Sequence, residues 1–196
     1  MKSFERLIKA LRRLPGVGPR QAERFCTYFL RAPQSQTEEF IAALREMKQN
    51  IRMCNRCFTY CEEEICSICS DESRNPALLC VVEESQDIEA IEKTKIFSGY
   101  YHVLHGALSP MDARGVDSLR IRELEERVKA SPDIKEIIIA TDPDTEGEAT
   151  ALYLSRLLAP LGPSISRIAY GVPLGGDLDY TDEMTLGYAI NGRTKI

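Results

Sequence analysis

The 196-residue sequence lacks any run of apolar residues long enough to span a bilayer, so we expect no transmembrane segment. We also expect no secretory signal, because the apolar residues near the start follow helical spacing and charges interrupt them. Neither G-x-S-x-G nor G-x-x-x-x-G-K-[ST] occurs, which removes support for serine-hydrolase and P-loop nucleotidase chemistry. We therefore expect a cytoplasmic protein with no membrane partner.

Histidine is scarce, since the chain contains only His102 and His105. Both lie near the end of an expected strand, where a hydrolase could use a histidine as acid or base. Isolated histidines in such places are more often packed or hydrogen-bonded. We therefore predict a structural role for both and assign no catalytic residue.

Cysteine is plentiful, and four of the seven cysteines form two C-x-x-C pairs that are eight residues apart. This spacing brings four thiolates within reach of one tetrahedral centre, which is the geometry that structural Zn²⁺ prefers. The alternative is two disulfides in a secreted protein, which nothing else in the sequence favours. The predicted zinc ligands are Cys54, Cys57, Cys66 and Cys69.

The other three cysteines have no matching partner pattern. Cys61 lies within the zinc segment and is an alternative ligand, although its spacing fits less well. Cys26 and Cys80 are expected to be small buried apolar residues. The zinc segment has few large apolar side chains, so metal binding would supply its folding free energy.

The net charge of −5 is unevenly distributed. Residues 1–56 hold twelve Lys and Arg against five Asp and Glu, a balance of +7, and residues 57–196 have a balance of −12. This asymmetry indicates a basic end that faces nucleic acid and an acidic body. The alternative is that both are ordinary solvated surfaces.

The sequence divides into segments of different character, which predict a multidomain α and α/β protein with a mostly parallel sheet. Residues 1–53 are expected to be helical only, 54–77 form the zinc segment, 78–172 an α/β domain and 173–196 a tail without clear periodicity. Within the α/β domain we expect strands at 78–82, 100–104, 134–140 and 165–170, and helices at 87–93, 117–129 and 145–158, the last opened by a Thr145-x-x-Glu148 capping box.

The helical end contains Leu14-Pro15-Gly16-Val17-Gly18-Pro19-Arg20 between two helical segments. Gly16 and Gly18 permit turn conformations that other residues disfavour, and the amides at the start of the next helix can face a phosphate. Arg20 and Arg24 are four residues apart, so they share a helix face. The segment resembles a helix-hairpin-helix motif, which binds DNA phosphates without reading bases. A tight helix connection without DNA contact is the alternative.

Acidic residues follow two of the expected strands: Glu83 follows one, and Asp142 and Asp144 follow another. The carboxyl ends of parallel strands are where α/β sheets present their sites, and clustered carboxylates suit Mg²⁺. We therefore consider a Mg²⁺ site at these three residues. The string D-P-D-x-E-G-E resembles the Toprim domain, whereas Glu146 and Glu148 could simply favour a helix N-terminus.

Taken in order along the chain, these segments resemble the RecR family of bacterial recombination mediators. The resemblance covers nearly the whole chain and rests on an ordered set of motifs: L-P-G-V-G-P-R at 14–20, the cysteines at 54–69, C-V-V-E at 80–83, Y-H-V-L-H-G-A-L-S-P-M-D at 101–112, E-G-E-A-T-A-L-Y-L at 146–154 and G-V-P-L-G-G-D-L-D-Y-T-D at 171–182.

The resemblance implies a DNA-repair scaffold and not an enzyme. Its expected state is a tetrameric ring that encircles single-stranded, double-stranded or gapped DNA without base specificity, with the hairpins lining the opening. Expected partners are RecO-like and RecF-like proteins, with which it would help load RecA; we expect it at the nucleoid. The α/β surface is the expected docking face for partners, and the tail the expected oligomer interface.

Two other functions compete with this expectation. Relatives commonly carry a neutral residue at one or both positions matching Asp142 and Asp144, whereas this chain keeps both aspartates. A Mg²⁺-dependent Toprim nuclease acting on DNA is therefore the main alternative. The other is a zinc-stabilised protein-interaction module that makes no DNA contact.

Overall fold

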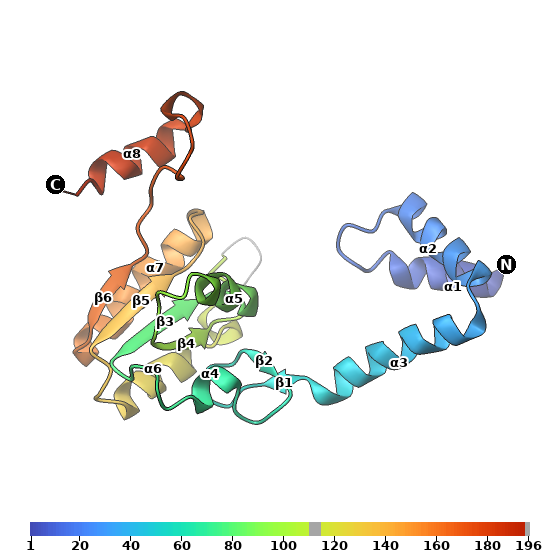
Figure 1. Cartoon of the computed structure of the whole chain (residues 1–196), viewed down its shortest axis with the longest axis horizontal. Coiled ribbons are helices and arrows are strands. Elements are labelled where there is room, and N and C mark those ends of the chain that lie inside the picture. Colours follow the sequence, from blue (N-terminus) through green and yellow to red (C-terminus); the bar gives the residue numbers. More distant parts are fainter. Residues whose placement is uncertain (110–114, 195–196) are drawn as a thin grey trace. The chain divides into compact units, whose positions relative to one another are not determined.

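A computed structural model describes residues 1–109 and 115–194 (Figure 1). The motif predicted at 101–112 and the tail predicted at 173–196 therefore extend outside the described residues, at 110–112 and 195–196. The chain divides into two compact units, Met1–Ile51 and Arg52–Ile196. Among the described residues, no helix is both long and apolar enough to cross a membrane.

The first unit consists of three helices, α1 (Lys2–Leu11), α2 (Pro19–Arg31) and α3 (Gln34–Asn50). The hairpin turn predicted at 14–20 joins α1 to α2, and these two helices pack together. In this fully described unit only Ala22 and Cys26 are buried, so the helices leave most of their apolar side chains exposed.

The expectation that residues up to 53 are only helical is wrong at its end. Strand β1 (Arg52–Met53) pairs antiparallel with β2 (Tyr60–Cys61), and this short ribbon opens the cysteine segment. Two-residue strands have no periodicity to detect. The turn that they enclose is closed by a backbone hydrogen bond, in which the amide of Cys54 donates to the oxygen of Thr59 at 2.8 Å.

The second unit is built on a four-stranded, all-parallel sheet with the strand order β4-β3-β5-β6 (Figure 1). The predicted mostly parallel α/β fold is therefore confirmed. The strands are β3 (Leu78–Val82), β4 (Tyr100–Val103), β5 (Glu136–Ala140) and β6 (Ser164–Arg167), and the helices are α4 (Ser67–Ser70), α5 (Ser85–Lys93), α6 (Ile121–Ala130), α7 (Thr145–Leu158) and α8 (Glu183–Asn191).

Helices cover both faces of the sheet. Leu79 and Val81 point to one face and pack with residues of α6 and α7. Cys80 and Val82 alternate with them, point to the other face and pack with Ile88 of α5. The apolar run of β3 is therefore buried on both sides, as expected for a central parallel strand. Cys26 and Cys80 are both buried, as predicted.

Several predicted bounds need correction. The helix expected at 117–129 is a 3₁₀ turn, η1 (Val116–Ser118), followed by α6, because Leu119 is extended and buried between them. The strand expected at 134–140 begins two residues later, and the one expected at 165–170 ends at Arg167.

The tail contains structure that the sequence did not predict. A 3₁₀ turn, η3 (Leu178–Tyr180), precedes α8, whose first turn is capped by Asp182 accepting from the amide of Thr185 at 2.9 Å. Another 3₁₀ turn, η2 (Ala159–Leu161), lies before the tail and directly follows α7. The ring of Tyr188 lies 5.0 Å from that of Tyr170. No described residue of α8 is buried, so the helix lacks the one-sided apolar pattern that would have revealed it.

Candidate metal centre and nucleic-acid interface

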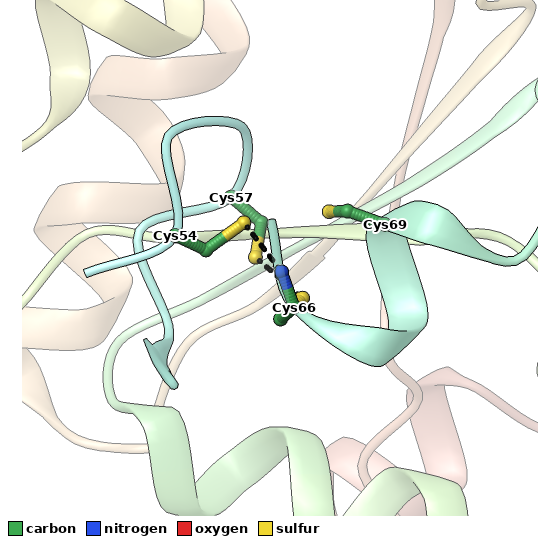
Figure 2. Close-up of side chains that lie close together, drawn as sticks. All are labelled: Cys54, Cys57, Cys66 and Cys69. Atoms are coloured by element: carbon green, nitrogen blue, oxygen red, sulfur yellow. Dashed lines mark hydrogen bonds between the residues drawn. The ribbon is translucent and has the colours of Figure 1, made fainter. Parts of the chain in front are cut away.

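The four predicted cysteine ligands converge on one point. The sulfur atoms of Cys54, Cys57, Cys66 and Cys69 all lie within 4.8 Å of one another, and the residues are at most 6% exposed (Figure 2). Within the described ranges, no other group of three or more His, Cys, Asp or Glu brings its ligand atoms this close. Four buried sulfurs in a compact cluster fit a tetrahedral zinc ion.

The local backbone places these sulfurs. Phe58 adopts a left-handed conformation, with φ of 67°, and its amide donates to the oxygen of Cys54 at 3.0 Å, which closes the first turn. The second C-x-x-C pair surrounds the start of α4. The amide of Cys66 donates to the sulfur of Cys54 at 3.3 Å, so a backbone dipole of the second pair already points at a sulfur of the first pair (Figure 2).

The electrostatics of the cluster favour a bound cation. The sulfurs of Cys57 and Cys66 lie 3.6 Å apart. The hydrogen bond between them lowers the pKa of Cys66 and raises the pKa of Cys57. One thiolate is therefore stabilised by the proton of its neighbour. A divalent metal would replace such protons and stabilise several thiolates together.

Cys61 packs against this cluster but is not one of its four converging sulfurs. Its thiol donates to the backbone oxygen of Glu63 at 3.0 Å, and the residue is only partly buried. The compact set of four buried sulfurs already supplies the ligands of a tetrahedral ion without Cys61, which favours the predicted ligands over the alternative.

The cysteine segment is attached to the edge of the sheet. The amide of Val103, on the edge strand β4, donates to the oxygen of Cys57 at 2.8 Å. Arg127 of α6 donates through Nη1 to the oxygens of Tyr101, at 2.6 Å, and Arg56, at 3.2 Å. Arg56 in turn donates to the oxygen of Cys69 at 2.9 Å. Sequence reasoning missed both arginines, because no local pattern predicts a contact between residues so far apart.

Both histidines are packed and hydrogen-bonded, as predicted. His102 is fully buried, its Nε2 lies 2.7 Å from the oxygen of Arg120, and burial lowers its pKa to about 4, so it is neutral. The Nε2 atom of His105 lies 2.7 Å from the oxygen of Phe58. The latter contact gives the cysteine segment another link to the α/β unit.

The predicted acids lie at the carboxyl ends of neighbouring strands. Glu83 follows β3, is only 8% exposed, and its Oε1 accepts from the amide of Asp142 at 3.0 Å. Burial raises the pKa of Glu83, and the charges of Asp142, Asp144 and Asp87 raise it further. Sequence reasoning missed Asp87 of α5, which lies near the carboxyl ends of these strands. In the described structure the three predicted acids are near neighbours but do not form a compact set of ligand atoms.

The predicted capping box at Thr145 is wrong by one residue. Asp144 caps α7, because its Oδ1 accepts from the amide of Gly147 at 2.8 Å, and Thr145 is the first helical residue. Gly147 is needed there, since a Cβ atom at this position would lie 2.1 Å from the oxygen of Asp142.

Glu146 and Glu148 do more than favour the helix N-terminus. Glu146 accepts a short hydrogen bond from the hydroxyl of Ser109. Glu148 pairs with Arg167 at 2.6 Å and accepts from the hydroxyl of Tyr170 at 2.8 Å. Both glutamates therefore tie α7 to neighbouring segments.

In the first unit, the hairpin turn has the features expected of a phosphate-binding turn. Gly16 has φ of 75°, a conformation that favours glycine, and Gly18 is the N-cap of α2 without any side-chain cap. No heavy atom would lie within 4 Å of a Cβ atom at either glycine, so the turn is open to a ligand. The first amides of α2 have no partner within the helix and point out of this end.

The arginines of α2 continue from this turn. Arg20 and Arg24 line one groove together with Thr27 and Arg31. Residues 20, 24, 27 and 31 follow helical spacing and form one stripe. None of the three arginines has an ion-pair partner in the described part of the chain. Arg31 and Thr27 were missed by sequence reasoning, although their spacing from Arg24 was a readable signal.

Comparison with known proteins places every segment in one family. Four family models match in order: the RecR helix-hairpin-helix at 4–48, the RecR zinc finger domain with four cysteines at 51–71, the Toprim domain at 77–169 and the RecR C-terminal segment at 171–194. The chain is 50% identical to the recombination protein RecR of Cutibacterium acnes, over 98% of this chain and 96% of that protein. It is 52% identical to that of Acidothermus cellulolyticus, over 97% and 95%, and 49% identical to that of Myxococcus xanthus, over 97% and 96%.

Proposed function

This chain belongs to the RecR family of recombination proteins, and we propose that it acts in DNA repair as a DNA-binding mediator and not as an enzyme. In the proposed mechanism a ring-shaped homotetramer encloses DNA, binds RecO-like and RecF-like proteins and helps to load RecA on gapped or single-stranded DNA. It would act in the cytoplasm, at the nucleoid. The observation that carries the proposal is the stripe of unpaired arginines that continues from the hairpin turn into α2.

DNA binding is proposed to occur at Gly16, Gly18, Arg20 and Arg24. Each guanidinium that neutralises a phosphate releases counterions, so binding weakens as salt is added. Replacing Arg20 and Arg24 together by Glu should weaken DNA binding and lower the slope of log K against log salt by about 2, or about 1 per lost contact.

The matched control is the double variant Arg45→Glu with Lys48→Glu, which makes the same charge change on α3, outside the arginine groove. Equal weakening in both variants would indicate a loss of overall charge only. Unchanged binding in the α2 variant would instead support the protein-interaction module without DNA contact.

Oligomerisation is proposed because the three-helix unit cannot bury its own apolar side chains. Phe40, Leu44, Met47 and Ile51 form one stripe along and just beyond α3, and each is 43–49% exposed. An apolar groove lined by Phe25, Phe29 and Phe40 lies between α2 and α3. We propose that a second copy of this chain covers the stripe and that further contacts, including the tail, complete a ring of four.

The mass in solution tests this arrangement. Leu44→Glu should dissociate the assembly, because it places a charge on the apolar stripe, whereas Gln49→Glu adds the same charge on the same exposed helix and should not. Light scattering after size exclusion gives the mass of each variant. A parent protein that stays monomeric with and without DNA would rule out a ring.

Structural zinc is proposed to be held by Cys54, Cys57, Cys66 and Cys69. Its role would be to fold the cysteine segment and to hold it on the edge of the sheet, with no part in chemistry. Metal analysis of the native protein should give one zinc per chain. A metal-free protein whose fold is unaffected by chelators would exclude the role.

Further proposals concern the boundaries and the partner face. We propose functional segments at 1–53, 54–77, 78–172 and 173–196, which the family matches follow approximately. The acidic surface at the carboxyl ends of the strands, with Glu83 and Asp142, is the proposed docking face for RecO-like and RecF-like partners. Pull-down of these partners with Asp142→Lys, compared with Asp133→Lys at the opposite end of β5, would test that assignment.

A Mg²⁺-dependent nuclease is the second candidate, because both Asp142 and Asp144 are present beside the buried Glu83. Against it, Asp144 is engaged as a helix cap and Glu83 accepts a backbone amide. Incubation of nicked, gapped and supercoiled DNA with Mg²⁺ separates the candidates. Cleavage that disappears when Asp142 and Asp144 are both replaced by Asn would overturn the mediator proposal.

A further inference from the structure

An exposed aromatic ring lies among the arginines of α2. Tyr28 is 52% exposed and lines the same groove as Arg20, Arg24 and Arg31. It follows Arg24 by four residues and precedes Arg31 by three, so helical geometry places it between their guanidinium groups. No DNA-binding residue predicted from the sequence was aromatic.

The ring of Tyr28 is held in place by its neighbours. Its hydroxyl accepts a hydrogen bond from Nε2 of Gln36 at 2.8 Å. Its ring contacts that of Phe29 edge to face, with the centroids 5.3 Å apart and the planes at 74°. Binding a flat ligand would therefore cost little conformational entropy in the side chain.

The length of the stripe suits a strand of nucleic acid. Arg20 and Arg31 are separated by about 16 Å along the helix axis, at a rise of ~1.5 Å per residue. Phosphates follow one another at about 3.4 Å along the axis for each strand of B-DNA and farther apart in an extended strand. The three guanidiniums can therefore contact several phosphates of one strand while Tyr28 faces the bases between them.

We infer that Tyr28 is a stacking platform for an unpaired nucleobase, flanked by phosphate contacts from Arg24 and Arg31. The inference rests on the proposed DNA binding by α2 and adds to it a preference for unpaired bases over duplex DNA. In a duplex each base is already stacked and paired, so the platform has no free base to bind. An unpaired base in a gap or single strand is available, and aromatic stacking tolerates any sequence.

Binding to oligonucleotides with and without bases tests the inference. The probes are a thymidine oligonucleotide and an abasic oligonucleotide with the same number of phosphates. The parent protein should bind the thymidine probe about tenfold more tightly, within the range for one stacked base. Tyr28→Ala should remove this difference and leave abasic binding unchanged, whereas Tyr28→Phe should keep it. Arg31→Gln should weaken both probes equally.

A spectroscopic test reports on the ring directly. The chain contains no tryptophan, so Tyr28→Trp gives a protein with a single tryptophan. Its fluorescence should be quenched by the thymidine probe and not by the abasic one. Tyr153→Trp, on the exposed surface of α7, should respond to neither.

The outcomes separate the inference from the function on which it rests. One outcome would overturn stacking by Tyr28 but leave the proposed DNA binding in place. In it, the Arg20 and Arg24 variant binds DNA more weakly, whereas Tyr28→Ala prefers the thymidine probe as strongly as the parent does. Unchanged binding by the arginine variant would overturn DNA contact itself. Because Tyr28 also borders the apolar groove, a Tyr28→Trp signal that depends on protein concentration and not on DNA would show that another copy covers the ring, and would overturn the inference.

Discussion

Replacement of Arg127 by Met should weaken zinc binding even though Arg127 contacts no metal. Four thiolates and one Zn²⁺ carry a net charge of about −2, and here they would be buried. Arg127 donates to the backbone oxygen of Arg56, which lies between Cys54 and Cys57. Burial lowers the pKa of Arg127, whereas the charges of the clustered cysteines Cys69, Cys57 and Cys54 raise it. Its guanidinium is thus the cation that α6 supplies to the cluster.

The expected magnitude follows from what the substitution removes. Met keeps much of the side-chain volume but removes the positive charge and the donor to the oxygens of Tyr101 and Arg56. Loss of an outer-shell partner typically lowers metal affinity by about 10- to 100-fold. We expect Arg127→Met to fall in this range. Arg127→Lys keeps the charge but loses the planar donor group, and should show a smaller loss.

Competition with a chromophoric chelator measures the zinc affinity of each variant, and circular dichroism verifies the fold. Arg122→Met is the matched control, because its side chain is on the same helix, is 73% exposed, and has the exposed Asp117 as its one ion-pair partner among the described residues. Zinc affinity within twofold of the parent in a folded Arg127→Met protein would refute the counter-charge argument. Equal losses in the Met and Lys variants would leave hydrogen bonding, and not charge, as the cause.

Three further predictions concern single side chains. Burial raises the pKa of Glu83, so the charged carboxylate lowers the stability of the fold at pH 7, and this loss disappears as the pH falls below the ordinary pKa of the group. Glu83→Gln should therefore raise the urea midpoint of unfolding more at pH 7 than at pH 4. An equal rise at both pH values would contradict the reasoning. Cys61→Ser should leave the zinc content at the parent value whereas Cys66→Ser should lower it, measured by metal analysis of purified protein. Gly147→Ala should destabilise the fold by about 1–3 kcal/mol in thermal unfolding, because the new Cβ meets a backbone oxygen; a change near zero would mean that α7 can shift.

The parts of the fold that the sequence predicts well are those with a strong local signal. Strand β3 and helix α7 match their predicted bounds, because an uninterrupted apolar run and a long periodic segment each leave little ambiguity. The four clustered cysteines are also readable, because two short spacings restrict where the sulfurs can lie. In α7 the cap was misplaced by one residue, since Asp144 and Thr145 are both good caps and only the three-dimensional bond distinguishes them.

The parts that could not be predicted depend on distant contacts or on weak patterns. Arg127 and Arg56 are 71 positions apart, and no spacing rule connects an α6 arginine with a cysteine knuckle. Helix α8 has no buried residue and has Gly187 in its interior, so its apolar pattern is indistinct. Arg31 is a different case, because its place on the same face as Arg24 followed from helical spacing alone.

The position of the cysteine segment explains how a small metal site can matter to the larger domain. Strand β4 is one of the two edge strands of the sheet, and edge strands expose backbone groups that invite wrong pairing. Here the outward amide of Val103 donates to the oxygen of Cys57, and the oxygen of Tyr101 accepts from Arg127. The cysteine segment and the Arg127 side chain therefore satisfy backbone groups of β4 that would otherwise be exposed. The segment has no large core of its own, and the bound metal would hold it in the shape that fits β4. Zinc would therefore stabilise the sheet domain by protecting its edge as well as by closing its own loop.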